Sequence, residues 1–114
     1  MLKAAIAKAR EAAAVANAVE PRAKSAYYDQ SSDRIIINLK SGATFGFPPN
    51  IAQGLAGASP EDLAEVEVTP SGDGLHWEKL DADFAVPALL AGVFGTKAWM
   101  AQIELGIENK LEIK

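Results

Sequence analysis

The chain has 114 residues with a net charge of −4 at pH 7, and 49% of its residues are hydrophobic and 23% charged. This length suits one domain and excludes two independent cores, and the composition is that of a globular protein rather than a disordered one. The absence of cysteine excludes disulfides, thiolate metal sites and a cysteine nucleophile, and the single histidine, His76, excludes a multi-histidine metal site within one chain.

No run of residues approaches the roughly 20 apolar side chains that a membrane span needs. The basic start and alanine-rich continuation of the chain only loosely resemble a signal peptide, because the stretch is short and interrupted by Glu11. We therefore expect a cytoplasmic protein without a membrane contact, and no cofactor motif is apparent.

Charge is unevenly distributed along the sequence. Residues 1–25 hold five basic and two acidic side chains, a net of +3, whereas the rest of the chain holds six basic and 13 acidic ones, a net of −7. An acidic body suits a basic partner protein and repels phosphate backbones. Any contact with nucleic acid is therefore expected at the basic side chains of the N-terminal part, which are Lys3, Lys8, Arg10, Arg22 and Lys24.

Residues 1–20 are expected to form a helical arm, because the segment is rich in alanine and Pro21 stops a helix. Its few large apolar side chains form no single stripe. Two interpretations remain open: the helix packs lightly on its own domain, or its small side chains let it approach a second copy of the chain and form a homodimer.

The pattern then changes to alternation. Residues 26–28, 34–40 and 43–47 are predicted to form a three-stranded meander with turns at 29–33 and 41–42. Ile35, Ile37 and Leu39 share one face of the second strand, and two prolines after residue 47 end the third.

A second hairpin is predicted further along. A short helix or turn occupies residues 50–58, and a brief helix follows, with Ser59 as its N-cap and Pro60 in its first position. Residues 65–69 and 75–77 alternate as strands around a glycine-rich turn.

The last third is predicted to be helical. One apolar helix spans 87–94 and ends at Gly95, and Thr96 caps a second helix. In that second helix Trp99, Ile103, Ile107 and Leu111 repeat at four-residue spacing and predict either core packing or a surface for a partner. The tail, 111–114, fits a helix or a short strand.

Together these elements predict an α+β fold. We expect a small antiparallel sheet of about four to five strands, arranged as two hairpins or a meander, with the alanine-rich helix before it and helices after it. Residues 21–114 form the single domain.

The densest polar cluster lies around Trp77 at the end of the second hairpin and contains His76, Glu78, Asp81 and Asp83. A histidine beside carboxylates is able to act in acid–base chemistry or to hold a metal, or the cluster contacts a ligand or partner. The structural alternative places His76 and Trp77 on opposite faces of a strand, with one of the aspartates capping the next turn. The spacing matches no known ligand motif.

Residues 21–101 resemble a family of small bacterial proteins known as domain of unknown function 2442. The matching segments are SGATFGFP (41–48), GLAGASPEDL (54–63), VEVTPSGDGLHW (66–77), LDAD (80–83) and VPALLAGVFG (86–95). The resemblance implies an antiparallel sheet with flanking helices and no established catalytic residues. It also implies a neighbouring gene for a second small protein, as in a toxin–antitoxin pair. The C-terminal helix-turn-helix or basic tail of some members is missing here.

Three functions follow from these observations. The first is a non-enzymatic interaction module, antitoxin-like, that binds a small partner protein. The second is a transcriptional regulator that contacts DNA phosphates through the basic arm. The third is an enzyme that uses a small ligand or a metal at His76, Asp81 and Asp83.

Overall fold

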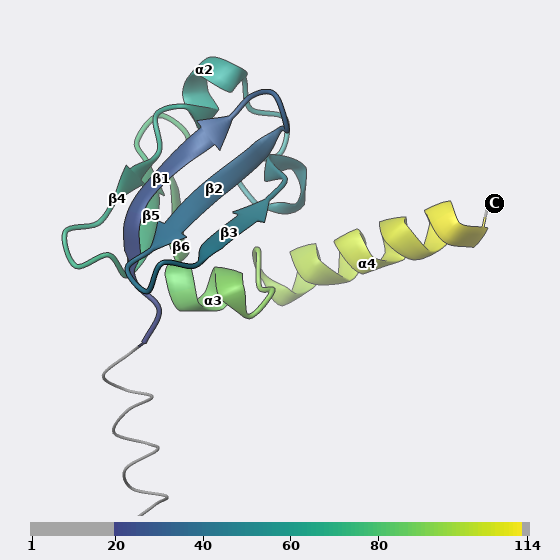
Figure 1. Cartoon of the computed structure of the whole chain (residues 1–114). Coiled ribbons are helices and arrows are strands. Elements are labelled where there is room, and N and C mark those ends of the chain that lie inside the picture. The colour runs from purple at the N-terminus through teal and green to yellow at the C-terminus, as the bar shows by residue number, and fades with distance from the viewer. Residues whose placement is uncertain (1–19, 113–114) are drawn as a thin grey trace, which may run out of the picture.

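The computed structural model describes residues 20–112, with side chains for residues 20–105, and shows an α+β fold built on two three-stranded antiparallel sheets (Figure 1). The strands of the first sheet are β1 (Ala23–Asp29), β2 (Arg34–Leu39) and β3 (Thr44–Phe47), and those of the second are β4 (Glu67–Val68), β5 (Gly74–Trp77) and β6 (Ala82–Ala85). The helices are η1 (Pro49–Ile51), α2 (Pro60–Leu63), α3 (Val86–Leu90) and α4 (Lys97–Glu112). The predicted alanine-rich arm, with Lys3, Lys8 and Arg10, lies outside the described residues.

The first sheet follows its predicted pattern. Ile35, Ile37 and Leu39 of β2 are buried, and Ile35 lies opposite Phe47 of β3. The opposite face is polar at one end, where Asn38 donates a hydrogen bond to Ser25 across to β1 and accepts one from Thr44 of β3. The alternation of the sequence therefore separates a core face from an outer face, as the period of two requires.

The second sheet differs from the prediction in its number of strands. We expected one sheet of four to five strands, but the described chain has six strands in two sheets, and the strand missing from the prediction is β6. Asp83 does not cap a turn, because it lies within β6 opposite His76. The strand predicted over residues 65–69 is shorter and comprises only Glu67 and Val68.

The two inner faces form one core. Trp77 of β5 is fully buried, and its ring meets Phe84 of β6 edge-on at a centroid separation of 5.8 Å. Its indole Nε1 donates a hydrogen bond of 3.0 Å to the carbonyl oxygen of Leu63, the last residue of α2. A helix end leaves carbonyls without intrahelical partners, and Trp77 supplies the donor that Leu63 needs.

The caps of the short helices explain where each begins and ends. Ser59 Oγ accepts a hydrogen bond from the amide of Asp62, as predicted for the N-cap of α2. Helix α3 ends at Leu90 rather than at the predicted residue 94. Gly92 has φ of +85°, and Val93 N–H donates to Ala88 O, which is the bond pattern of a glycine-terminated helix.

Helix α4 begins where predicted. Thr96 Oγ1 accepts a hydrogen bond from the amide of Trp99, so Thr96 is the N-cap. The helix then continues to Glu112, which removes the strand alternative for Leu111 and Glu112; the last two residues lie outside the described part. Figure 1 shows α4 leaving the body of the protein, away from both sheets. Among the described residues, no helix has the length and hydrophobicity that crossing a membrane requires.

We predict that Trp77→Phe lowers the free energy of unfolding by about 2–4 kcal/mol, because it leaves a cavity and removes the donor to the buried Leu63 carbonyl. Urea unfolding followed by circular dichroism measures this loss. The matched control is Trp99→Phe, which removes a similar bond, from Trp99 Nε1 to Ile51 O at 2.8 Å, at a half-buried position. We expect a loss of about 1 kcal/mol there, and equal losses in the two variants would contradict the central role of Trp77.

Candidate functional site

The polar cluster predicted around residue 76 exists, and His76 is its centre. The side chain projects from the outer face of the second sheet, opposite the inward Trp77, and lies across from Glu67 of β4 and Asp83 of β6. His76 Nδ1 lies 2.6 Å from Asp83 Oδ1, and His76 Nε2 lies 2.7 Å from Glu78 Oε2. The sequence analysis placed both Asp83 and Glu78 in this cluster, and both are bonded to the histidine ring.

The two carboxylates raise the pKa of His76 from 6.5 to about 9, because hydrogen bonds to Glu78 and then to Asp83 favour the protonated ring. At neutral pH the imidazolium therefore donates from both nitrogens. Neither nitrogen is left as a lone-pair donor for a metal or as a base, which weakens the enzymatic interpretation of this cluster. Among residues 20–112, no three His, Cys, Asp or Glu side chains are arranged to hold a metal ion.

Asp81 lies beside this cluster but belongs to the turn before β6. Its φ of +49° is the left-handed conformation that aspartate tolerates in turns, and its side chain forms no ion pair within the described chain. The structure therefore joins His76 with Asp83 and leaves Asp81 facing outward. Trp77, the fourth predicted contact residue, is buried and serves the core.

A shallow open groove of about 490 Å³ runs along β6. Asp81, Asp83 and Ala85 line one side, and Ala88, Val93 and Thr96 line the other. The groove therefore lies between a sheet edge and the segment that leads into α4. Sequence reasoning missed this groove because it missed β6.

One side chain fixes the far wall of the groove. Gln53 N–H donates to Phe94 O at 2.9 Å, and its Oε1 accepts from the Thr96 amide at 2.9 Å. Gly95 lies between them, where an added Cβ would come within 2.8 Å of Gln53 atoms and 2.6 Å of the Trp99 ring. The segment 94–96 is thus held closely against the turn that follows η1, and glycine is required there by this close approach.

The basic residues predicted to contact nucleic acid are only partly described. Arg22 lies 3.4 Å from Glu20 and 3.7 Å from Asp73, so its charge is shared with two carboxylates of the same chain. Lys24 is exposed at an irregular position of β1. Lys40 N–H donates to Arg22 O at 2.9 Å, so a third basic residue lies next to Arg22.

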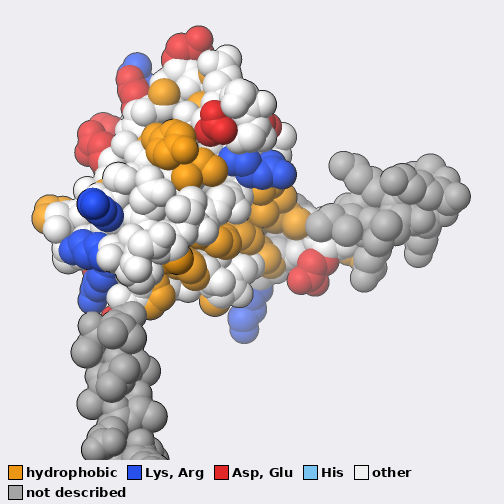
Figure 2. Space-filling view, in the orientation of Figure 1, with side chains coloured by type: hydrophobic (Ala, Val, Ile, Leu, Met, Phe, Trp, Pro, Cys, Tyr) orange, Lys and Arg blue, Asp and Glu red, His pale blue; other side chains and the backbone are white. Residues whose placement is uncertain are grey.

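The base of α4 packs two large apolar side chains against the body. Met100 Sδ accepts a hydrogen bond from Phe94 N–H, and Trp99 Nε1 donates to Ile51 O, so both side chains face the body. Figure 2 shows hydrophobic side chains gathered over β3 and toward this base, with most charged side chains at the periphery. Leu105, further along the helix, is 57% exposed.

The fold agrees with the comparisons to known proteins. The model of a family described as protein of unknown function (DUF2442) matches residues 23–95. The chain belongs to this family. The matched segment includes both sheets and α3 and ends immediately before Thr96, so the DUF2442 match covers the groove wall formed by β6 but not α4.

Two solved structures of similar chains have the same fold. A protein of unknown function from Rhodospirillum rubrum is 59% identical, with a TM-score of 0.69 over 71% of this chain and 98% of that one. An uncharacterized protein from Chromobacterium violaceum, determined by NMR in solution, is 30% identical, with a TM-score of 0.67 over 84% of this chain and 87% of the other. None of the curated proteins matches this DUF2442 member.

We predict that an NMR titration of His76 gives a pKa of about 9, and that Glu78→Gln and Asp83→Asn each lower it toward 6.5. Glu67→Gln is the control, because Glu67 lies across the sheet from His76 but forms no hydrogen bond to the ring. A wild-type pKa near 6.5 would show that the paired geometry does not persist in solution.

The same shift makes stability depend on pH. Because the folded pKa exceeds the unfolded value, the folded protein binds more protons between pH 6.5 and about 9. The stabilisation by His76 is therefore complete below pH 6.5 and is lost as the pH rises through about 9. We expect the free energy of unfolding to fall across this window in the wild type and to change less in His76→Gln, as measured by urea unfolding at several pH values.

Proposed function

We propose that the protein is a non-enzymatic interaction module, with an antitoxin-like role, that binds a small partner protein through helix α4. The observation that carries this proposal is the apolar stripe of α4, which begins on the body of the protein and continues beyond it. The description of the family as one of unknown function is compatible with this role and assigns no other.

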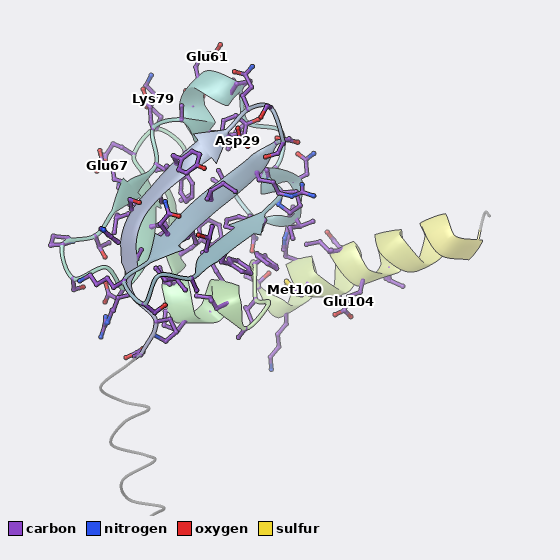
Figure 3. All side chains as sticks on the ribbon, in the orientation of Figure 1. Asp29, Glu61, Glu67, Lys79, Met100 and Glu104 are labelled. Carbon is purple, nitrogen blue, oxygen red and sulfur yellow. The ribbon has the colours of Figure 1, made fainter. Side chains whose placement is uncertain are left out.

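The stripe begins as part of the folded body. Trp99 and Met100 are half-buried and contact the segment around Ile51 and Phe94. Figure 3 places Met100 at this base and Glu104 further out, where the helix has already separated from the sheets. The helix is therefore half-buried at Trp99 and Met100 and exposed at Leu105.

The apolar stripe continues along the helix away from the body. Ile103 is half-buried, and the sequence repeats the four-residue spacing at Ile107 and Leu111. A 16-residue helix is marginal in water on its own, because its stability in proteins comes from packing of an apolar face. A helix face that lies in a groove of another protein is a recurrent mode of recognition and would supply that packing.

The charge of the protein supports a basic partner. Residues 26–114 have a net charge of −7, and this excess steers cationic proteins toward the body and repels nucleic acid. The pairing of Arg22 with Glu20 and Asp73 also removes one of the five side chains on which the regulator hypothesis depends. We therefore favour the protein partner over DNA.

Photo-crosslinking in the native cell tests this proposal. A photoreactive amino acid replaces Ile107, on the apolar stripe, in one variant and Glu61 of α2, at the far end of the body in Figure 3, in another. We expect position 107 to crosslink to one small basic protein that mass spectrometry identifies, and position 61 to give no such product. Crosslinks only to a second copy of the chain, or equal products at both positions, would overturn the proposal.

A substitution on the same helix quantifies the contact. In a chain with the photoreactive group at 107, Ile103→Asp is expected to reduce the crosslinked product at least tenfold, because it places a charge in the apolar interface. Glu104→Gln is the matched control at the next position, and it should leave the yield within twofold. Equal yields in the two variants would show that the apolar stripe does not form the interface.

A further inference from the structure

We propose that the free edge of β6 binds an extended segment of a partner protein that carries basic side chains, and that this segment becomes a fourth strand of the second sheet. This site lies apart from the apolar stripe of α4. It goes beyond the proposed function and does not depend on it, because a different set of atoms carries it.

The first argument is the position of β6 in its sheet. The strand order is β4–β5–β6, so β6 has a neighbour on only one side. Its partner residues on β5 run from Gly74 opposite Ala85 to Trp77 opposite Ala82. A strand at a sheet edge presents unpaired backbone groups and is a template for another strand.

The second argument identifies the unpaired groups. In an antiparallel pair the directly opposed residues alternate between hydrogen-bonded and non-hydrogen-bonded pairs. Val86 N–H donates to Asp73 O at 2.8 Å, one register step beyond β6. The alternation then directs the N–H groups of Phe84 and Ala82 to β5, and those of Asp83 and Ala85 to the free edge.

The free-edge groups have no partner in residues 20–112. Neither the Asp83 N–H and C=O nor the Ala85 N–H takes part in any backbone or side-chain hydrogen bond outside the strand ladder. Strand addition would satisfy all three, because it supplies alternating donors and acceptors at the same spacing. The edge is thus two residues long and oriented outward.

The third argument is the space beside this edge. The groove of about 490 Å³ lies along it, which is within the range of natural ligand sites, roughly 300–1,000 Å³. Val93, which is 47% exposed, and Ala88 give the groove an apolar side. Gln53 holds this same side in place through its bonds to Phe94 and Thr96, so the groove is preformed.

The fourth argument is charge. Asp81 and Asp83 are the charged residues that line the groove, and no lysine or arginine lines it. The positive charge of His76 is shared between Asp83 and Glu78. The three carboxylates Asp81, Asp83 and Glu78 therefore keep a net negative charge in the presence of His76. Basic side chains on the incoming segment complement this charge, and an acidic segment would be repelled.

These arguments define the chemistry of the occupant. Side chains of a strand alternate between the two faces, so one set would meet Asp81 and Asp83 and the other set Val93 and Ala88. An extended segment that alternates lysine with valine fits both. The peptide acetyl-Lys-Val-Lys-Val-Lys-amide is therefore the probe that we would use.

Substitution of Ala85 tests the edge with little effect on the fold. Ala85 has φ of −85° and ψ of 129°, which is close to the conformation of proline, and its N–H has no partner to lose. Ala85→Pro removes the edge donor and adds a ring there, whereas Ala85→Val, the matched control, keeps the N–H. Fluorescence polarisation with the labelled peptide is expected to show binding to wild type and Ala85→Val, and binding at least tenfold weaker to Ala85→Pro.

Peptide variants test the same claim on the intact protein. A peptide N-methylated at the central lysine lacks a backbone donor, and a Glu-Val-Glu-Val-Glu peptide reverses the charge. Both are expected to bind at least tenfold more weakly than the probe, and Asp81→Asn should weaken the probe several-fold. Absence of saturable binding of the probe, equal binding of the N-methylated peptide, or equal binding of the acidic peptide would each overturn the proposal. These outcomes concern the β6 edge and are independent of the crosslinking experiment on α4.

Discussion

The packing of Trp77 between the two sheets is the interaction on which the rest of the structure depends. Its indole ring fills the centre of the core, and its Nε1 satisfies the last carbonyl of α2. The same strand, β5, directs His76 to the outer face, where two carboxylates hold it. Trp77 thus fixes the inner packing. Because neighbouring side chains of a strand point to opposite faces, His76 lies on the outer face with the polar cluster.

The core is complete without two parts of the described surface. All the buried hydrophobic side chains of the described chain form one cluster, which includes Ala82 and packs against Phe84, whereas Asp83 and Ala85 of the same strand and Leu105 of α4 lie outside it. The groove beside β6 and helix α4 are both next to the segment that Gln53 holds. Thr96 of this segment lines the groove and is also the N-cap of α4. A partner that binds the edge and a partner that binds the helix would therefore meet at Thr96, so one protein is able to use both surfaces.

The sequence predicts most of the fold where side-chain alternation is strong or where a cap is clear. β2 with its three inward side chains, the N-cap Ser59 and the N-cap Thr96 were all predictable. β6 was not, because Ala82–Ala85 contains two alanines and an aspartate, with Phe84 as its one residue that favours a strand, and its pairing with β5 makes it a strand. The end of α3 was misplaced because Gly92 and Gly95 are both candidate stops. The cluster of His76, Glu78 and Asp83 was found, but the adjacent groove depends on the register of β5 and β6.

The central claim is that the fold is complete while the β6 edge stays open, and amide hydrogen exchange followed by NMR tests it most directly. The account predicts that the Phe84 amide of the free protein is strongly protected, because it bonds to β5, and that the amides of Asp83 and Ala85 on the same strand exchange at rates typical of open backbone. Protection of Asp83 and Ala85 as strong as that of Phe84 would show that the edge is already covered in the free protein and would contradict the account.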